Sequence, residues 1–269
     1  MHALLSRPLD ALLATLALLA LFIPTGADAQ ARGFANVAPT NVDVALVLAV
    51  DASQSMDKEE QTLQRDGYVG ALTSEEVLTA ISYGRHRRIA VAYFEWGSLD
   101  QQVLVAPWTI IDGPDAAKAF AARIGSAPLN NLQRTSISAA MTYAGELFTR
   151  SGVNATRKVV DISGDGPNNQ GVVVSEARDA LVSQGVTING LPIVIKETNL
   201  DWNPIPQLDR YYEDCVIGGE GSFAIPVKGM ANFGTALKMK LVLEIAGLTL
   251  DLPRVIPAAA TTTNCRYYE

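Results

Sequence analysis

Oxygen-bearing side chains stand at three places where an expected element begins or ends. Asp51, Ser53 and Ser55 follow an apolar run directly, in the spacing Asp-x-Ser-x-Ser. Asp165 follows a second apolar run, and Thr135 lies near the start of an expected helix. Two carboxylates and three hydroxyls suit a hard divalent cation such as Mg²⁺ or Mn²⁺, which favours octahedral oxygen coordination and keeps several waters. These five residues are the candidate metal ligands.

An Asp-x-Ser-x-Ser motif also has a purely structural interpretation. Ser53 or Ser55 could cap the helix expected to begin near Asp57, and Asp165 could lie in an ordinary Asp-Gly turn. The isolated motif favours this interpretation. The position of the motif after a buried strand, with Asp165 after another strand, favours a metal site instead.

The sequence leaves the roles of two residues near the expected site open, Thr135 and Glu95. Ser136 and Ser138 lie within one helical turn of Thr135 and offer alternative hydroxyls for the same ligand position. Glu95 follows the second expected strand. Glu95 is either an acid that supports the metal ligands without binding the metal itself, or a solvated loop residue.

The elements that must position these residues alternate along the chain. Residues 42–50 (VDVALVLAV) form a nearly continuous apolar run, typical of a central strand covered on both faces of a parallel sheet. Further strands are predicted at 89–94, 101–108, 158–163, 186–195 and 223–227. Helices are predicted at 58–72, 115–124, 135–148, 172–184, 205–215 and 230–245. This order predicts an α/β fold with an open, mostly parallel, doubly wound sheet, helices on both faces and one antiparallel edge strand. Ligands of such sheets bind beyond the carboxyl ends of the strands.

The chain from about residue 42 to about residue 246 resembles a von Willebrand factor type A (vWA) domain. That family has a metal-ion-dependent adhesion site built from Asp-x-Ser-x-Ser, a distant Thr and a distant Asp, which match the five candidate ligands. Many members read Thr-Asp-Gly where this chain has Gly164-Asp165-Gly166, and Gln54 replaces a frequent Gly. Neither change removes an oxygen ligand. Other short motifs look close to an exported bacterial branch of the family: Glu95-Trp96, Ser163-Gly164-Asp165-Gly166 and Val216-Ile217-Gly218-Gly219.

The resemblance implies a Rossmann-like fold and a binding function. A cation held by neutral hydroxyls and few carboxylates keeps its Lewis acidity, and it can take an Asp or Glu side chain of a protein partner at an open position. The sequence therefore predicts an exported binding module that captures an acidic group of a protein partner. A structural domain with an empty site is an alternative from a different class.

Enzyme classes find less support in the motifs. The chain has no Gly-x-Ser-x-Gly, no P-loop and no Gly-x-Gly-x-x-Gly after a strand, and His86 lies in a basic cluster at 84–88. The stronger rival is a metal-dependent phosphohydrolase with Asp51 as nucleophile beside Mg²⁺. It would need a second Asp at position 53 and a Lys near Asp165, and the sequence supplies neither. We therefore do not expect an enzyme.

The N-terminus reads as a secretory signal peptide. Arg7 precedes an apolar run at 11–23, and Ala27-Asp28-Ala29 forms a small-residue cleavage motif before Gln30. The run is shorter than the roughly 20 residues of a membrane-spanning helix. We expect a signal peptide at 1–29, a leader at 30–41, a vWA-like domain at 42–246 and a tail at 247–269. The cleaved protein should be periplasmic or secreted, with no membrane span.

The charge and the cysteine content of the chain argue against nucleic-acid binding and against a zinc site. The chain has 21 Lys and Arg against 28 Asp and Glu, a net charge of -7, so binding of nucleic acid through a basic face is not expected. Cleavage would remove one basic and two acidic residues and leave -6. In an oxidising compartment, Cys215 and Cys265 are expected to form a disulfide rather than a zinc site, since cleavage leaves a single histidine. The alternative is a free Cys265 near the C-terminus.

Overall fold

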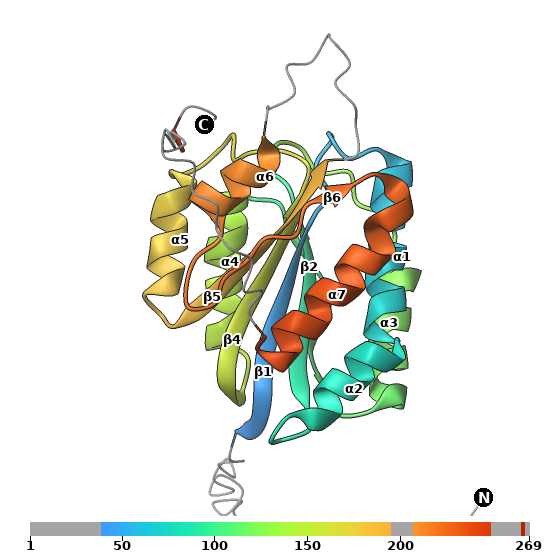
Figure 1. Ribbon diagram of the computed structural model, residues 1–269. Coiled ribbons are helices and arrows are strands. Elements are labelled where there is room, and N and C mark those ends of the chain that lie inside the picture. The colour runs from blue at the N-terminus through green and yellow to red at the C-terminus, as the bar shows by residue number, and fades with distance from the viewer. Residues whose placement is uncertain (1–38, 195–206, 249–264, 267–269) are drawn as a thin grey trace, which may run out of the picture. The chain divides into compact units, whose positions relative to one another are not determined.

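A six-stranded sheet forms the centre of the fold. The computed structural model describes residues 39–194, 207–248 and 265–266, and the sheet has the strand order β3-β2-β1-β4-β5-β6 (Figure 1). The central strand β1 (Thr40–Asp51) pairs in parallel with β2 (Ile89–Trp96) and β4 (Val153–Gly164). Beyond β4, the strands β5 (Val186–Val194) and β6 (Val227–Lys228) continue the parallel arrangement. At the other edge, β3 (Gln102–Ile111) is antiparallel to β2. The predicted mostly parallel sheet with one antiparallel edge strand is confirmed.

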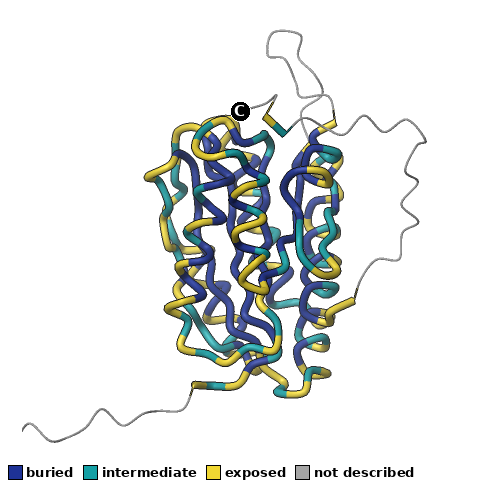
Figure 2. The backbone as a smooth tube through the Cα atoms, turned by 90° about the vertical axis from the view of Figure 1, so that its left-hand side faces the viewer, coloured by how far each residue is buried: buried dark blue, intermediate teal, exposed yellow. Residues whose placement is uncertain are grey.

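Helices cover both faces of the sheet (Figure 1). One face carries α1 (Lys58–Leu72), α2 (Glu75–Tyr83), α3 (Pro114–Ser126) and α7 (Phe233–Ala246). The other face carries α4 (Ile137–Thr149), α5 (Val174–Val182), α6 (Leu208–Tyr211) and the π-helical turn η1 (Tyr212–Val216). A short 3₁₀ turn, η2 (Met230–Asn232), precedes α7. Figure 2 shows buried residues along the strands and inner helix faces, with exposed residues on the outside.

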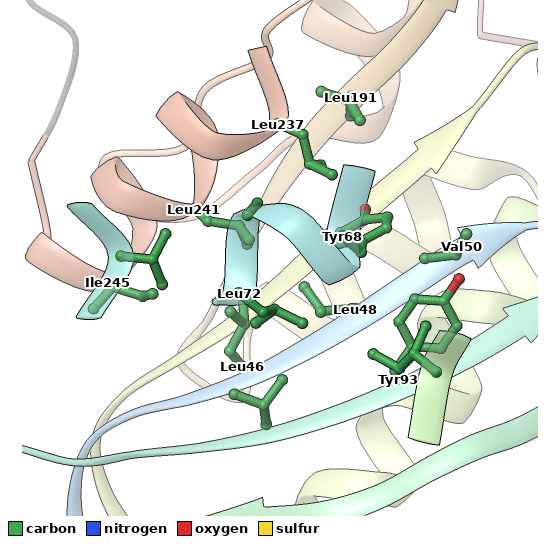
Figure 3. Close-up of a cluster of buried hydrophobic side chains, with 14 of the residues drawn as sticks. Leu46, Leu48, Val50, Tyr68, Leu72, Tyr93, Leu191, Leu237, Leu241 and Ile245 are labelled. Carbon is green, nitrogen blue, oxygen red and sulfur yellow. The ribbon is translucent and has the colours of Figure 1, made fainter. Parts of the chain in front are cut away.

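The alternation of side chains along β1 separates two cores. Val44, Leu46 and Leu48 point into the core beneath α1 and α7, whereas Ala45 and Val47 point into the core beneath α4 and α5. Successive residues of a strand face opposite sides of a sheet, so a strand buried on both sides is apolar throughout. Figure 3 shows the first of these cores, where leucines of α7 meet Leu46, Leu48 and Tyr68.

Several predicted boundaries were wrong. The helix α2 was not predicted, although Ser74 caps it by accepting a hydrogen bond from Val77 N. β4 begins at Val153 instead of residue 158, because its polar first half pairs with the start of β1. The strand predicted at 223–227 is reduced to Val227–Lys228. The helix predicted at 230–245 starts as a 3₁₀ turn, and the one predicted at 205–215 is α6 followed by η1.

The structure contains the expected disulfide. Cys215, fully buried in η1, is bonded to Cys265, and the two α-carbons are 5.7 Å apart. The expected signal peptide and most of the leader and tail lie outside the described residues. Among those described, no helix is both long and apolar enough to cross a membrane.

Candidate metal centre

The carboxyl end of β1 is held tightly by its neighbours. The backbone carbonyl of Asp51 accepts a hydrogen bond from Gln64 Nε2 at 2.9 Å, and Ala52 N donates to Trp96 O at 3.0 Å. The fully buried Asp51 side chain folds back over the turn, where its Oδ1 accepts a hydrogen bond from Ser53 N at 2.8 Å. This local turn orients the carboxylate of Asp51 toward the hydroxyls that follow it.

A chain of hydroxyls connects the ends of β1 and β4. Ser53 Oγ lies 2.9 Å from Ser55 Oγ, and Ser55 Oγ donates to Asp165 Oδ1 at 2.6 Å. Ser53 is buried, Asp165 is half-buried and Ser55 is exposed. The group therefore has a buried floor and a side open to solvent, from which a ligand can approach.

Thr135 is brought to the same place by the loop before α4. Thr135 N donates to Asn169 Oδ1 at 3.0 Å, and Asn169 N donates to Thr135 O at 2.8 Å. A Cβ atom at Gly166 would lie 3.9 Å from Thr135 Oγ1. Thr135 Cγ2 lies at the same distance from this point, so the Thr135 side chain stands beside the backbone directly after Asp165. All five candidate ligands therefore stand at the carboxyl edge of the sheet.

The neighbouring serines have structural roles. Ser136 is the N-cap of α4, and its hydroxyl also donates to Gln170 O at 2.8 Å. Ser138 Oγ donates to the same carbonyl at 3.3 Å. Both hydroxyls therefore point toward residue 170, and Thr135 remains the candidate ligand of this segment.

The helix after the motif is capped by neither of its serines. Asp57 is the N-cap of α1 and forms a capping box with Glu60, in which each side chain accepts a hydrogen bond from the other's backbone N–H. The interpretation in which Ser53 or Ser55 caps this helix is wrong.

Electrostatics at the centre favour a bound cation. Burial, and then repulsion from Asp165, raise the pKa of Asp51 to about 8. Asp51 Oδ2 is buried and has no hydrogen-bond partner among the described residues. No group of three or more His, Cys, Asp or Glu side chains suited to a metal occurs in the described ranges. The oxygen-only donor set, with two carboxylates that repel each other, fits a hard divalent cation that takes its remaining ligands from hydroxyls and water.

Comparison with known proteins identifies the family. The family model "Protein of unknown function (DUF1194)" matches residues 41–249. The chain belongs to the DUF1194 family. A search of curated proteins finds no match.

Solved structures show that this DUF1194 chain has the vWA fold. Proximal thread matrix protein 1 from the mussel byssus has a TM-score of 0.55 and 18% identity, over 77% of this chain and 49% of that one. A von Willebrand factor type A protein from Catenulispora acidiphila has a TM-score of 0.54 and 15% identity, over 76% and 43% of the two chains. Another structure of the mussel protein, with a zinc-occupied MIDAS motif, has a TM-score of 0.52 and 19% identity, over 77% and 49%. The DUF1194 chain spans about half the length of these proteins or less.

Glu95 of the DUF1194 chain is not a solvated loop residue. It lies in β2, is 4% exposed and forms an ion pair with the buried Arg65 of α1. Asn130 Nδ2 donates to its other carboxylate oxygen at 2.7 Å, and Arg65 also donates to Pro128 O at 3.1 Å. These interactions hold the loop that leads to Thr135 against α1 and β2.

Sequence reasoning missed other residues that support the centre. Asn168 Oδ1 accepts a hydrogen bond from Ser138 N at 3.0 Å, and Asn168 N donates to Tyr211 Oη at 3.1 Å. Tyr212 was also missed, and its hydroxyl lies beside Gly164 and Asp51. The asparagines after Pro167 were visible as a polar loop after a strand, but no local pattern showed their partners.

Proposed function

We propose that this DUF1194 protein is an exported binding module. It holds Mg²⁺ or Mn²⁺ at Asp51, Ser53, Ser55, Thr135 and Asp165, and the cation captures an acidic side chain of a protein partner. The hydrogen-bonded chain from Ser53 through Ser55 to Asp165 carries this proposal, because it gathers oxygen ligands from two strand ends beside a buried carboxylate.

The charge of the chain explains why capture would depend on metal. The full chain has a net charge of -7, which the proposed cleavage changes to -6, and Asp165 reaches the open side of the centre. Without a cation, an approaching carboxylate would meet the negative charge of Asp165. A divalent cation balances the charges of Asp51 and Asp165, and an open coordination position lets the cation bind the carboxylate of the partner directly.

The comparisons support the cation part of the proposal. The mussel protein of the same fold has a structure with a zinc-occupied MIDAS motif. At 19% identity this likeness is one of fold, so the choice of cation and partner rests on the residues of this chain. An all-oxygen donor set favours Mg²⁺ or Mn²⁺ over zinc, which is bound mainly by nitrogen and sulfur ligands.

The phosphohydrolase alternative is less well supported by the geometry. A nucleophilic carboxylate must reach the phosphorus atom of its substrate, whereas the side chain of Asp51 is fully buried and one oxygen accepts a backbone hydrogen bond. Turnover of a generic phosphate ester in Mg²⁺, lost in Asp51→Ala, would support the enzyme instead.

The location of the protein follows from its N-terminus. Residues 1–29 act as a signal peptide and are removed before Gln30, and a leader at 30–41 and a tail at 247–269 flank the vWA-like domain at 42–246. The protein is then periplasmic or secreted, a location compatible with the disulfide between Cys215 and Cys265.

A partner-capture experiment tests the proposal. The immobilised protein is exposed to periplasmic extract in Mg²⁺ and in chelator, beside Asp165→Ala and the control Asp66→Ala, which removes an exposed carboxylate of α1. We expect one set of partners that elutes with chelator from the wild type and the control and is missing from Asp165→Ala. Capture that is equal in Mg²⁺ and chelator contradicts the proposal.

A further inference from the structure

Gly164, the last residue of β4, touches three buried side chains behind the candidate metal centre. A Cβ atom at this position would lie 2.8 Å from Asp51 Oδ2, 2.9 Å from Tyr212 Oη and 3.3 Å from Trp96 Cζ2. All three side chains are fully buried. A threonine at position 164 would therefore collide with two oxygen atoms, and this chain has glycine there because Asp51 and Tyr212 occupy the space.

The polar atoms around Gly164 are chemically complementary. Asp51 Oδ2, Tyr212 Oη and Trp96 Nε1 are buried and have no hydrogen-bond partner among the described residues. A buried polar group without a partner loses its hydration and gains nothing in return. Asp51 Oδ2 is an acceptor, and the Tyr212 hydroxyl can donate. Both atoms lie within 3 Å of the same point beside Gly164.

The backbone around Tyr212 is fixed without help from Asp51. Ile217 N donates to Tyr212 O at 2.9 Å within η1, and the guanidinium of Arg178 donates to the carbonyls of Asp214 and Cys215 at 3.0 and 3.1 Å. Single π-helical turns of this kind are often found at functional sites. The Tyr212 hydroxyl is thus carried on a rigid support.

We propose that Tyr212 is a positioning residue for Asp51. A small shift of the Tyr212 side chain beside Gly164 brings its hydroxyl into donating distance of Asp51 Oδ2, the oxygen that the backbone of Ser53 does not hold, and together the two donors fix the direction of the carboxylate. The effect of Tyr212 on cation affinity rests on the proposed function. The contact between Tyr212 and Asp51 is independent of the proposed function.

A metal-free double-mutant cycle tests the contact. The unfolding equilibrium constant is measured in chelator for the wild type, Tyr212→Phe, Asp51→Ala and the double variant. We expect Tyr212→Phe to raise the constant at least ten-fold more in the wild-type background than in the Asp51→Ala background. Equal effects in both backgrounds, within two-fold, overturn the proposal.

If Asp51→Ala does not fold, a crystal structure of the wild type decides, since Tyr212 Oη should lie within about 3 Å of Asp51 Oδ2. A separation above about 3.5 Å overturns it.

A metal titration tests the positioning role. Tyr212→Phe is compared with Tyr68→Phe, which removes an equally buried hydroxyl on the other face of the sheet, 3.4 Å from Asp161 Oδ2. We expect the Mg²⁺ dissociation constant to rise ten-fold or more in Tyr212→Phe and less than two-fold in Tyr68→Phe. Equal changes in the two variants overturn the positioning role. If the wild type does not bind Mg²⁺ or Mn²⁺, the proposed function and this role both fail, whereas the metal-free cycle still decides the contact.

Discussion

The hydroxyl of Ser55 donates a 2.6 Å hydrogen bond to Oδ1 of Asp165, a residue 110 positions further along the chain. The contact exists because β1 and β4 are parallel neighbours, in a register that places Val50 opposite Ser163. The loops after the two strands therefore begin at the same level of the sheet edge. The same register places Asp51 near Gly164 and explains why the space at that position matters.

Thr135 and Ser136 are adjacent hydroxyls with separable roles. Thr135→Val keeps the shape of the side chain but removes a proposed metal ligand, so we expect a Mg²⁺ dissociation constant about ten times higher, equivalent to about 1.4 kcal/mol. Ser136→Ala removes the N-cap of α4 and should lower the free energy of unfolding by about 1 kcal/mol. Its effect on the Mg²⁺ dissociation constant should be small. Calorimetric titration and chemical denaturation check the two effects, and the reverse pattern would show that Ser136 is the ligand.

A buried cluster of charged residues beneath α7, on the face of the sheet that carries α1, should make the free energy of unfolding depend on pH. Burial is the main reason that the pKa of Glu244 rises to about 7, opposed by Lys240 and reinforced by Asp161. The folded protein then binds this proton more tightly than the unfolded chain, so the stabilising contribution is complete below about pH 4.5 and is lost as the pH rises through about 7. Around Glu244 stand Lys240 of α7, Asp161 and Arg157 of β4, Asn189 of β5 and Tyr68 of α1.

Glu244→Gln isolates this effect, because the amide resembles the protonated acid. We expect the variant to gain stability relative to the wild type as the pH is raised from about 5 to about 8. The difference between the two proteins cancels the contribution of Asp51, which also titrates in this range. A stability difference that does not change with pH would show that Glu244 stays ionised in the folded protein.

The disulfide should stabilise the folded protein, because it closes a long loop and so restricts the unfolded chain. Cys215 and Cys265 are 50 residues apart, and a loop of this length contributes about 4 kcal/mol in the chain-entropy model. We expect Cys215→Ala combined with Cys265→Ala to lower the free energy of unfolding by an amount of this order. A reducing agent should destabilise the wild type and leave the double variant unchanged. Two reactive thiols in the denatured, unreduced wild type would contradict the prediction.

Export should leave a defined N-terminus. Because the small-residue motif ends at Ala29, the protein recovered from the periplasm or medium should begin at Gln30, with its N-terminal glutamine cyclised. Intact-mass measurement and N-terminal sequencing check this. Protein in the membrane fraction that retains Met1 would refute cleavage.

The sequence was most informative where one strand or turn carries the signal. The apolar run of β1 indicated a strand buried on both faces, and the rule that ligands gather at the carboxyl ends of parallel strands pointed to Asp51 and Asp165 without any knowledge of their contacts. The half-buried start of β4 was missed, since the polar residues between Asn154 and Lys158 weaken the apolar pattern used to find strands.

The parts of the site that escaped prediction depend on contacts between distant segments. Glu95 could be read either as a second acid or as a loop residue, because its partner Arg65 lies 30 positions earlier on α1. Tyr212 approaches Asp51 because η1 packs against α5 and β5, and its own neighbourhood in the sequence gives no sign of this. Gly164 was noted as a departure from a common motif, but its reason required the positions of both oxygens.

The effect of Mg²⁺ on stability tests the central claim most directly. A ligand at about 100 times its dissociation constant adds roughly 2.7 kcal/mol to the free energy of unfolding, enough for a visible rise in melting temperature. We expect this rise in Mg²⁺ and Mn²⁺ for the wild type and for Asp66→Ala, and none for Asp51→Ala, whose metal-free fold should survive. Ser53→Ala should keep part of the rise, because water can replace a neutral hydroxyl. Wild-type melting curves that are identical in Mg²⁺, Mn²⁺ and chelator would contradict the metal centre.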